Sequence, residues 1–383
     1  MTSEARAAFE LAPDRLPLNH GSFGAVPRVV REEQDRWRAH IERDPTSFYA
    51  FELPALLRAG ANGPAKRFGG ESGDWVFCEN ATAAVSSVLH GLQLGPGDEI
   101  VTTSHAYGAV LQAMRWIAAR TGAALVLAEL PAILTSEDEV AAAVERVLGP
   151  RTRLLVVDHI TSASAAILPV ARLATLARHF EVPVLVDGAH APGHIALDVP
   201  ALGVDWYTGN AHKWLFAPRG CGLLWTAPAR QAETRPAVLS HGTDKGYTEA
   251  FDWIGTRDPS AWLCFDTAAA AHDGFGGAAL MAGNRAMAAQ GAAHLVERLG
   301  LVPSAPASMR GAMAALTFGE APDDPELPNA FRRALTAEHG VVAPISVLAG
   351  KLWLRISAQI YNAPEDYERC ATAVAAVRRR FNV

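Results

Sequence analysis

Short apolar runs alternate with amphipathic stretches along the first 225 residues of the chain. A short apolar run between turn residues is typical of a buried strand, whereas apolar residues three and four positions apart are typical of a helix. Regular alternation of the two predicts an α/β fold, with a mostly parallel sheet and helices on both faces. The runs predict seven strands, at 75–79, 99–103, 124–128, 153–157, 182–186, 204–208 and 220–225. A short turn, Pro218-Arg219-Gly220, precedes the last strand, which is therefore predicted to be antiparallel.

The pattern changes after residue 225. Residues 227–248 are rich in Pro, Gly and polar residues and predict a loop, and residues 259–299 are Ala-rich and helical. Shorter strands and two helices then predict a smaller α+β domain. We expect an N-terminal segment (1–28), a large domain (29–258) and a small C-terminal domain (259–383) that begins with a linking helix (259–299). The remaining predicted elements are helices at 29–40, 53–68, 109–120, 137–148, 329–339 and 365–381, and strands at 314–318, 341–344 and 352–356.

Composition and charge exclude several classes of protein. Half of the 383 residues are hydrophobic and 19% are charged, which is typical of a globular chain. The net charge of −6 and the absence of any Lys/Arg block argue against nucleic-acid and membrane partners. No signal peptide and no apolar run of about 18 residues is found, so a cytoplasmic protein is expected. Scattered cysteines without a CxxC pair predict neither a metal site nor a disulfide framework: Cys78, Cys221, Cys264 and Cys370.

An aspartate and a lysine follow two neighbouring predicted strands. Asp187 ends the strand at 182–186, and Lys213 comes shortly after the strand at 204–208. Ligands of open α/β sheets bind beyond the carboxyl ends of strands, so both side chains are expected at one edge. Trp214, Leu215 and Phe216 follow the lysine, and a desolvated lysine is a usable amine nucleophile. The pair suits pyridoxal phosphate, which needs a lysine Schiff base and an acidic partner for its ring nitrogen. Taken alone, Asp187 would more often be a turn or cap residue, and Lys213 would more often be a surface amine.

Further polar residues follow other predicted strands. Ala81 and Thr82 stand where the first strand passes into a helix, whose first N–H groups can bind an anion. The alternative is that Asn80 or Thr82 only caps that helix. Either His105 or Tyr107, after the second strand, could stack on a flat cofactor ring.

Two more segments carry candidate residues. Ser162 follows the strand at 153–157, where its hydroxyl would by itself be read as capping the next helix. His20 and Gly21 belong to the turn-rich run Leu18–Gly24, whose glycines allow the backbone to approach a ligand closely.

Several motifs in consistent order resemble the class V aminotransferase family, and within it the isopenicillin N epimerase-like branch. The motifs are LNHGSFG, ENATAA, SHAYGA, DHITS, VDGAHAPG, GNAHKW, FDWIGTRD and LRISAQIYN. The resemblance implies the pyridoxal-phosphate transferase fold of type I, and residues 1–28 packing at the active-site mouth and on the small domain.

The resemblance also implies a role for each matching residue. Lys213 would form the Schiff base, Asp187 would pair with the ring nitrogen, and His190 would lie near the ring. Arg355 would bind the substrate carboxylate, with His20 and Gly21 at the substrate side. Thr256 would reach the phosphate of the neighbouring subunit, so a homodimer is implied. The other cofactor contacts would be Tyr107 stacking on the ring, Ser162 at its phenolic oxygen, and Ala81, Thr82, Asn210 and His212 at the phosphate.

The implied activity is chemistry at the Cα of an amino acid, through an external aldimine and a quinonoid. Epimerisation or racemisation is the leading expectation, with C–S (β-elimination) lyase or aminotransferase as alternatives. Epimerisation needs a second acid/base opposite Lys213, for which His20, Tyr107 and His241 are candidates. No cysteine lies between Gly340 and Arg355, which disfavours a cysteine desulfurase. The motif Ser162-Ala163-Ser164 departs from the family's Ser-Pro-Thr and leaves the substrate open. A non-enzymatic regulator is disfavoured because no basic helix-turn-helix extension is found.

Overall fold

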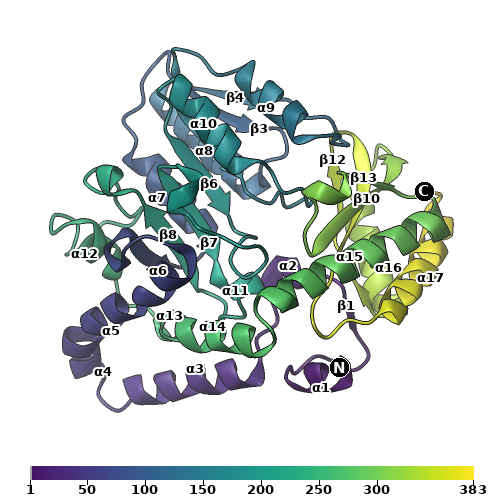
Figure 1. Ribbon diagram of the computed structural model, residues 1–383, viewed down its shortest axis with the longest axis horizontal. Coiled ribbons are helices and arrows are strands. Elements are labelled where there is room, and N and C mark those ends of the chain that lie inside the picture. Colours follow the sequence, from purple (N-terminus) through teal and green to yellow (C-terminus); the bar gives the residue numbers. More distant parts are fainter. Residues whose placement is uncertain (1) are drawn as a thin grey trace.

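A seven-stranded sheet forms the centre of the larger part of the molecule in the computed structural model, which describes residues 2–383 (Figure 1). The strand order is β2-β8-β7-β6-β5-β3-β4. Only β8 runs antiparallel to its neighbours, as predicted from the short turn before it. The strands are β2 (Trp75–Cys78), β3 (Glu99–Thr103), β4 (Ala124–Ala128), β5 (Thr152–Asp158), β6 (Val184–Gly188), β7 (Trp206–Asn210) and β8 (Gly222–Thr226).

Alternating side chains on these strands belong to two cores, one on each face of the sheet. Val184 and Val186 of β6 join one core, whereas Leu185 between them joins the other. The same alternation holds in β5 and β7, because successive side chains of a strand point to opposite faces. The helices around the sheet are α3 (Arg28–Ile41), α4 (Pro45–Ser47), α5 (Leu53–Gly60), α6 (Asn62–Phe68), α7 (Ala81–Gly91), α8 (Gly108–Thr121), α9 (Glu137–Glu145), α10 (Val170–His179), α11 (Ala211–Trp214), α12 (Tyr247–Asp252), α13 (Ser260–Leu263) and α14 (Phe265–Gly274).

Several predicted boundaries are corrected. The single helix predicted at 53–68 is two helices, α5 and α6, preceded by a π-helical turn at Phe48–Glu52. β6 begins at Val184, not 182, because Val182 N–H bonds to Ala177 at the end of α10 and Pro183 has no N–H. The loop predicted at 227–248 contains a 3₁₀ turn, Pro228–Arg230.

A second sheet and three long helices form the C-terminal part (Figure 1). Its strands run in the order β12-β13-β10-β9 and pack against the helices in a separate core. The sequence did not reveal β9 and β12, and the Ala-rich stretch predicted as one linking helix is α13, α14 and α15. The elements are α15 (Ala278–Leu299), β9 (Val302–Pro303), β10 (Met313–Glu320), α16 (Leu327–His339), β11 (Val341–Val342), β12 (Ile345–Leu348), β13 (Lys351–Ser357) and α17 (Pro364–Phe381).

The N-terminal segment connects the two parts. It contains α1 (Thr2–Ala7), the short strand β1 (Leu16–Pro17), which pairs in parallel with β11, and α2 (His20–Phe23). In Figure 1, α2 lies beside α11, between the large sheet and the C-terminal part.

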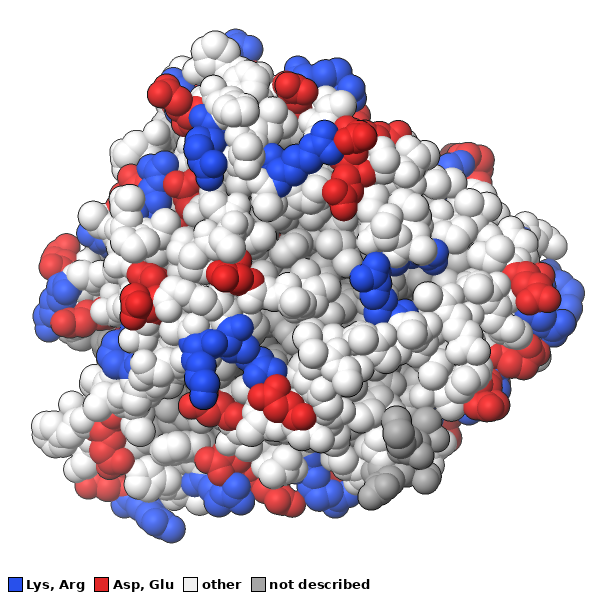
Figure 2. Space-filling view, in the orientation of Figure 1, with Lys and Arg blue, Asp and Glu red and all other residues white. Residues whose placement is uncertain are grey.

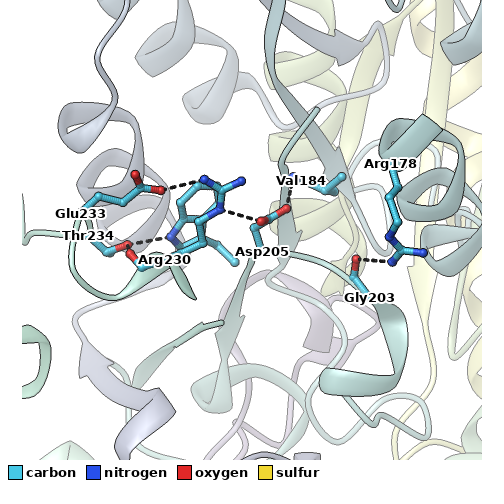
Figure 3. Close-up of polar contacts among 8 residues, drawn as sticks. Arg178, Val184, Gly203, Asp205, Arg230, Glu233 and Thr234 are labelled. Atoms are coloured by element: carbon cyan, nitrogen blue, oxygen red, sulfur yellow. Dashed lines mark hydrogen bonds and ion pairs between the residues drawn. The ribbon is translucent and has the colours of Figure 1, made fainter. Parts of the chain in front are cut away.

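A polar cluster at the amino-terminal ends of β6 and β7 fixes where these two strands begin (Figure 3). The carboxylate of Asp205 accepts the N–H of Val184 at 2.8 Å and pairs with the Arg230 guanidinium at 2.7 Å. Trp206 donates its indole N–H to Thr234 at 2.8 Å. These bonds hold the two strands in register, so that their far ends present side chains next to one another.

No helix in the described part of the chain is long and apolar enough to cross a membrane. Acidic and basic side chains alternate around the face shown in Figure 2, without a large field of one sign.

Two glycines of α15 give a matched stability test. A methyl group at Gly291 would overlap the ring of Tyr367, whereas nothing lies within 4 Å of one at Gly283. Alanine is better than glycine in a helix by about 1 kcal/mol, but overpacking a core costs about 1–3 kcal/mol. We therefore expect Gly291→Ala to lower the free energy of unfolding and Gly283→Ala to raise it. Urea titration of both variants is the measurement, and a stabilised Gly291→Ala would contradict this packing.

Candidate active site

A cavity of about 430 Å³ lies at the carboxyl ends of β5, β6 and β7. Asp158 and Asn210 end their strands, Asp187 is the last residue but one of β6, and all three project to the same face, that of α7, by the alternation described above. The cavity wall contains nine of the residues singled out from the sequence: Ala81, Thr82, Tyr107, Ser162, Asp187, His190, Asn210, His212 and Lys213. His20, Gly21, Thr256 and Arg355 are not part of this wall.

Lys213 lies on the one-turn helix α11, directly after β7. Its Nζ atom is 3.3 Å from Nε2 of His190. Burial lowers the pKa of Lys213 to about 8, against the opposing effect of Asp187. A sizeable minority of the amine is therefore neutral near physiological pH, and the neutral form is the one that attacks a carbonyl.

Two buried carboxyl groups lie on neighbouring strands beside this lysine. Asp187 and Asp158 are paired residues of β6 and β5 and are 3% and 4% exposed. The Asp187 carboxylate accepts the N–H of Ala189 at 3.0 Å. Burial raises the pKa of both groups, and the charge of Asp187 raises that of Asp158 further. A cationic ring nitrogen placed here would favour ionised Asp187.

The start of α7 forms a cradle for an anion. Asn80 caps the helix by accepting the N–H of Ala83 at 2.9 Å, and Asn210 accepts the N–H of Ala81 at 2.8 Å. Thr82, in the first turn of α7, also lines the cavity. His212 donates from Nδ1 to the carbonyl of Cys221 at 3.1 Å, which leaves Nε2 on the cavity side. The cap by Asn80 is therefore confirmed, and it leaves the helix N-terminus as a candidate site for an anion.

Arg355 reaches the rim of the cavity from β13 of the C-terminal part. It is 6% exposed, and no acidic side chain pairs with it among the described residues. Its guanidinium donates to neutral oxygens of Ser162, at 2.7 and 3.2 Å, of Asn19 at 3.0 Å, and of Ser22 at 2.9 Å. Burial lowers its pKa to about 10. A buried cation without a counter-ion attracts an anion, and a guanidinium fork matches a carboxylate.

His20 and Gly21 support the site from behind. Nδ1 of His20 is 2.8 Å from the Tyr361 hydroxyl, and Nε2 donates to the carbonyl of Lys213 at 3.0 Å. A methyl group at Gly21 would come within 2.6 Å of Met313 and 3.2 Å of Trp214. In this segment it is Ser22 and Phe23 that line the cavity.

Thr256 lies away from the cavity of its own chain. It is exposed, in a bend between α12 and α13. The flanking Arg257 is held firmly, by an ion pair with Glu79 at 2.9 Å and by the Tyr49 hydroxyl, which donates to its carbonyl at 2.7 Å.

The cavity fits pyridoxal phosphate by the chemistry of its donors. It combines a lysine of lowered pKa, a buried carboxylate next to it, and a helix N-terminus with a histidine beside it. Sequence reasoning did not single out Asp158, Asn19 or Ser22 as site residues. Asp158 had a usable signal, because it ends a strand that neighbours the strand of Asp187. Asn19 and Ser22 had none, since their role depends on β13 docking near the N-terminal segment.

The family model described as aminotransferase class-V matches residues 36–369. The isopenicillin N epimerase of Streptomyces clavuligerus is 33% identical over 397 residues, covering 98% of this chain and 98% of that protein. The putative L-cysteine desulfhydrase 1 of Oryza sativa subsp. japonica is 30% identical over 397 residues, covering 93% of this chain and 82% of that protein.

Solved structures show the same fold. The cystine C–S lyase C-DES, in complex with its product cysteine persulfide, matches with a TM-score of 0.82 at 22% identity, covering 95% of this chain and 98% of that one. The chain belongs to the class V aminotransferase family, whose members are pyridoxal-phosphate-dependent enzymes.

Proposed function

We propose that this enzyme epimerises or racemises an amino acid at Cα. The observation that carries the proposal is the buried guanidinium of Arg355, without an acidic partner in the described chain, at the rim of the cavity that holds Lys213. A guanidinium in that place binds an α-carboxylate, and the substrate Cα then lies between Arg355 and Lys213. The similarity to isopenicillin N epimerases supports the same reaction class.

Each residue of the site has a proposed role. When bound, pyridoxal phosphate supplies an electron sink conjugated to the substrate nitrogen, which acidifies the Cα proton. Asp187 would hold the ring nitrogen protonated, Tyr107 would stack on the ring, His190 would lie near the ring, and Ser162 would contact its phenolic oxygen. Lys213 accepts the Cα proton, a role that is worth about 10²–10⁴-fold in rate. The phosphate group is held by Ala81, Thr82, Asn210 and His212.

The N-terminal segment holds the carboxylate-binding residue in place. We assign residues 29–258 to a large domain and 259–383 to a small one. Lys213 and Arg355 then belong to different domains. Asn19 and Ser22, from the segment 1–28, accept hydrogen bonds from Arg355 and fix its guanidinium. His20 and Gly21 act in the same segment by supporting Lys213 and Trp214 from behind.

Epimerisation needs a second proton donor on the face of Cα opposite Lys213. Of the three candidates from the sequence, only Tyr107 lines the cavity. His20 has both ring nitrogens bonded elsewhere, and His241 is exposed. We propose Tyr107 as that donor.

A C–S lyase is the second candidate, because β-elimination needs Lys213 alone as acid and base. The L-cysteine desulfhydrases among the relatives support it. The two candidates therefore differ in their need for Tyr107.

We propose a homodimer in which Thr256 donates to the phosphate of the neighbouring subunit. Thr256 is exposed on a firmly held segment, and Gly255 before it has a φ of 121°, which glycine adopts without strain. Large exposed apolar side chains support association with a second chain, among them Phe51 (76%) and Leu239 (66%).

We also propose a cytoplasmic location. All four cysteines are buried free thiols, as is usual in a reducing compartment.

The reaction is tested by incubating the holoenzyme with L- and D-amino acids in D₂O. We expect deuterium at Cα with inversion, and no reaction with amines that lack the carboxylate. Tyr107→Phe should retain exchange on one face and lose inversion. Release of pyruvate, unchanged in Tyr107→Phe, would instead establish the lyase, and a keto acid product would establish transamination.

Capture of the cofactor by cofactor-free protein should depend on pH through Lys213. Lysine is cationic below its pKa and nucleophilic above it, so the capture rate should rise as the pH passes through about 8. The rate is followed by the absorbance of the bound cofactor between pH 6 and 10. Lys213→Arg should not capture it at any pH. A rate that falls with increasing pH over this range would contradict the assignment.

The cross-subunit contact is tested with Thr256→Val, which removes the hydroxyl donor and preserves side-chain shape. A ligand that binds only the dimer stabilises it by mass action. We expect weaker cofactor retention and easier dissociation on dilution, measured by sedimentation, with Thr175→Val, an exposed helical threonine, as the control. A holoenzyme that remains monomeric with cofactor fully bound would disprove the contact.

A further inference from the structure

The indole group of Trp214, which can donate a hydrogen bond but cannot accept one, lies close to one ring nitrogen of His190. The indole Nε1 of Trp214 lies 3.4 Å from Nδ1 of His190, while Nε2 of the same ring lies 3.3 Å from Nζ of Lys213. An indole N–H can only donate, so Nδ1 must accept. Burial, and next the charge of Lys213, hold the pKa of His190 well below its ordinary value, so the ring is neutral and has one proton. That proton is therefore on Nε2, facing the lysine.

This proton position affects the charge of Lys213. An ammonium group has three donors and no acceptor, so it cannot form a hydrogen bond with an Nε2–H group. A neutral amine has a lone pair and can accept that bond. The tautomer of His190 thus favours the neutral lysine, in addition to the effect of burial.

Trp214 is rigidly placed for this contact. Its ring packs against His194, with centroids 4.1 Å apart, and against His20, with centroids 5.1 Å apart. His194 accepts the N–H of Ala312 on Nε2 at 2.6 Å, so its Nδ1–H donates to the carbonyl of His190 at 3.0 Å. Both neighbouring rings therefore have defined protons and cannot turn without breaking a buried hydrogen bond.

We propose that Trp214 is a positioning residue: its indole N–H fixes His190 as the Nε2–H tautomer, and so favours the neutral amine of Lys213. The inference rests on the proposed function only in taking Lys213 as the group that binds the cofactor.

Other charged groups around Lys213 act independently of this contact. The carboxyl groups on β5 and β6 raise its pKa and the guanidinium on β13 lowers it: Asp158, Asp187 and Arg355. His194 and Arg355 also lower the pKa of His190. Changing Trp214 leaves all of them in place, so a changed titration of Lys213 reports the tautomer.

The tautomer is measured directly in cofactor-free protein by NMR with ¹⁵N-labelled histidine, where His190→Asn identifies the resonances. We expect a neutral His190 with its proton on Nε2 in the wild type. In Trp214→Phe we expect part or all of that proton on Nδ1. A wild-type ring protonated on Nδ1, or an unchanged tautomer in the variant, would overturn the proposal.

The consequence for Lys213 is measured by the pH dependence of pyridoxal phosphate capture. Once Nε2 can accept, the ammonium form gains a hydrogen bond, so the midpoint should rise by about one pH unit in Trp214→Phe. Because Trp214→Phe also loses packing, benzothienylalanine at position 214 serves as a second variant that keeps the ring size but has no N–H group. It should show the same rise.

Trp206→Phe is the control. It loses the buried indole hydrogen bond to Thr234, which lies at the amino-terminal end of β7, away from the cavity. In this variant the tautomer of His190 and the pH midpoint of pyridoxal phosphate capture should match those of the wild type. Unchanged midpoints in both position-214 variants would overturn the proposal. Failure of the epimerase assignment would leave the NMR result intact, because no substrate takes part in it.

Discussion

The burial of charged groups at the carboxyl ends of the central strands is the constraint on which the site depends. Removing an ion from water costs several kcal/mol unless it is paired or neutralised. Lys213, Asp158 and Asp187 respond by shifting their pKa values toward the neutral forms. Arg355 stays cationic near neutral pH and is instead surrounded by four neutral oxygen acceptors. Two features of this site are suited to anions: the N-terminus of α7 and the guanidinium of Arg355.

Strand register determines which side chains meet at these carboxyl ends. Asp158 and Asp187 lie side by side because β5 and β6 are parallel and pair residue for residue. Asp205 at the other end of β6 and β7 fixes where both strands begin, so the register is set far from the cavity. The N-terminal segment then links β13 to α11: Asn19 and Ser22 accept hydrogen bonds from Arg355, and His20 donates one to the carbonyl of Lys213.

Much of this architecture is visible in the sequence, because it rests on local patterns. Strands such as 99–103 and 124–128 are apolar runs with turn residues at both ends, and their bounds were predicted to the residue. Asp187 and Lys213 were found because each follows such a run. The failures have a common cause in non-local structure. β9 and β12 are too short to have a periodicity of their own, and β6 starts late because a helix end and a proline remove two donors. Asn19 and Ser22 acquire their role only when a strand more than 300 residues away docks against them.

The direction of each hydrogen bond determines which histidine nitrogen has the proton. Neither the sequence pattern nor the strand register gives this information. Each buried imidazole near Lys213 meets one partner whose role is fixed: an indole N–H for His190, a backbone N–H for His194, and a carbonyl for His20. These partners decide which nitrogen has the proton. A histidine fixed as a donor toward Lys213 cannot also act as a base there, so in the proposed reaction the Cα proton on that side is left to the lysine. The same argument bears on why a tryptophan follows the lysine: a phenyl ring would fill only part of the space between His20 and His194, and it has no N–H group to set the direction of the hydrogen bond to His190.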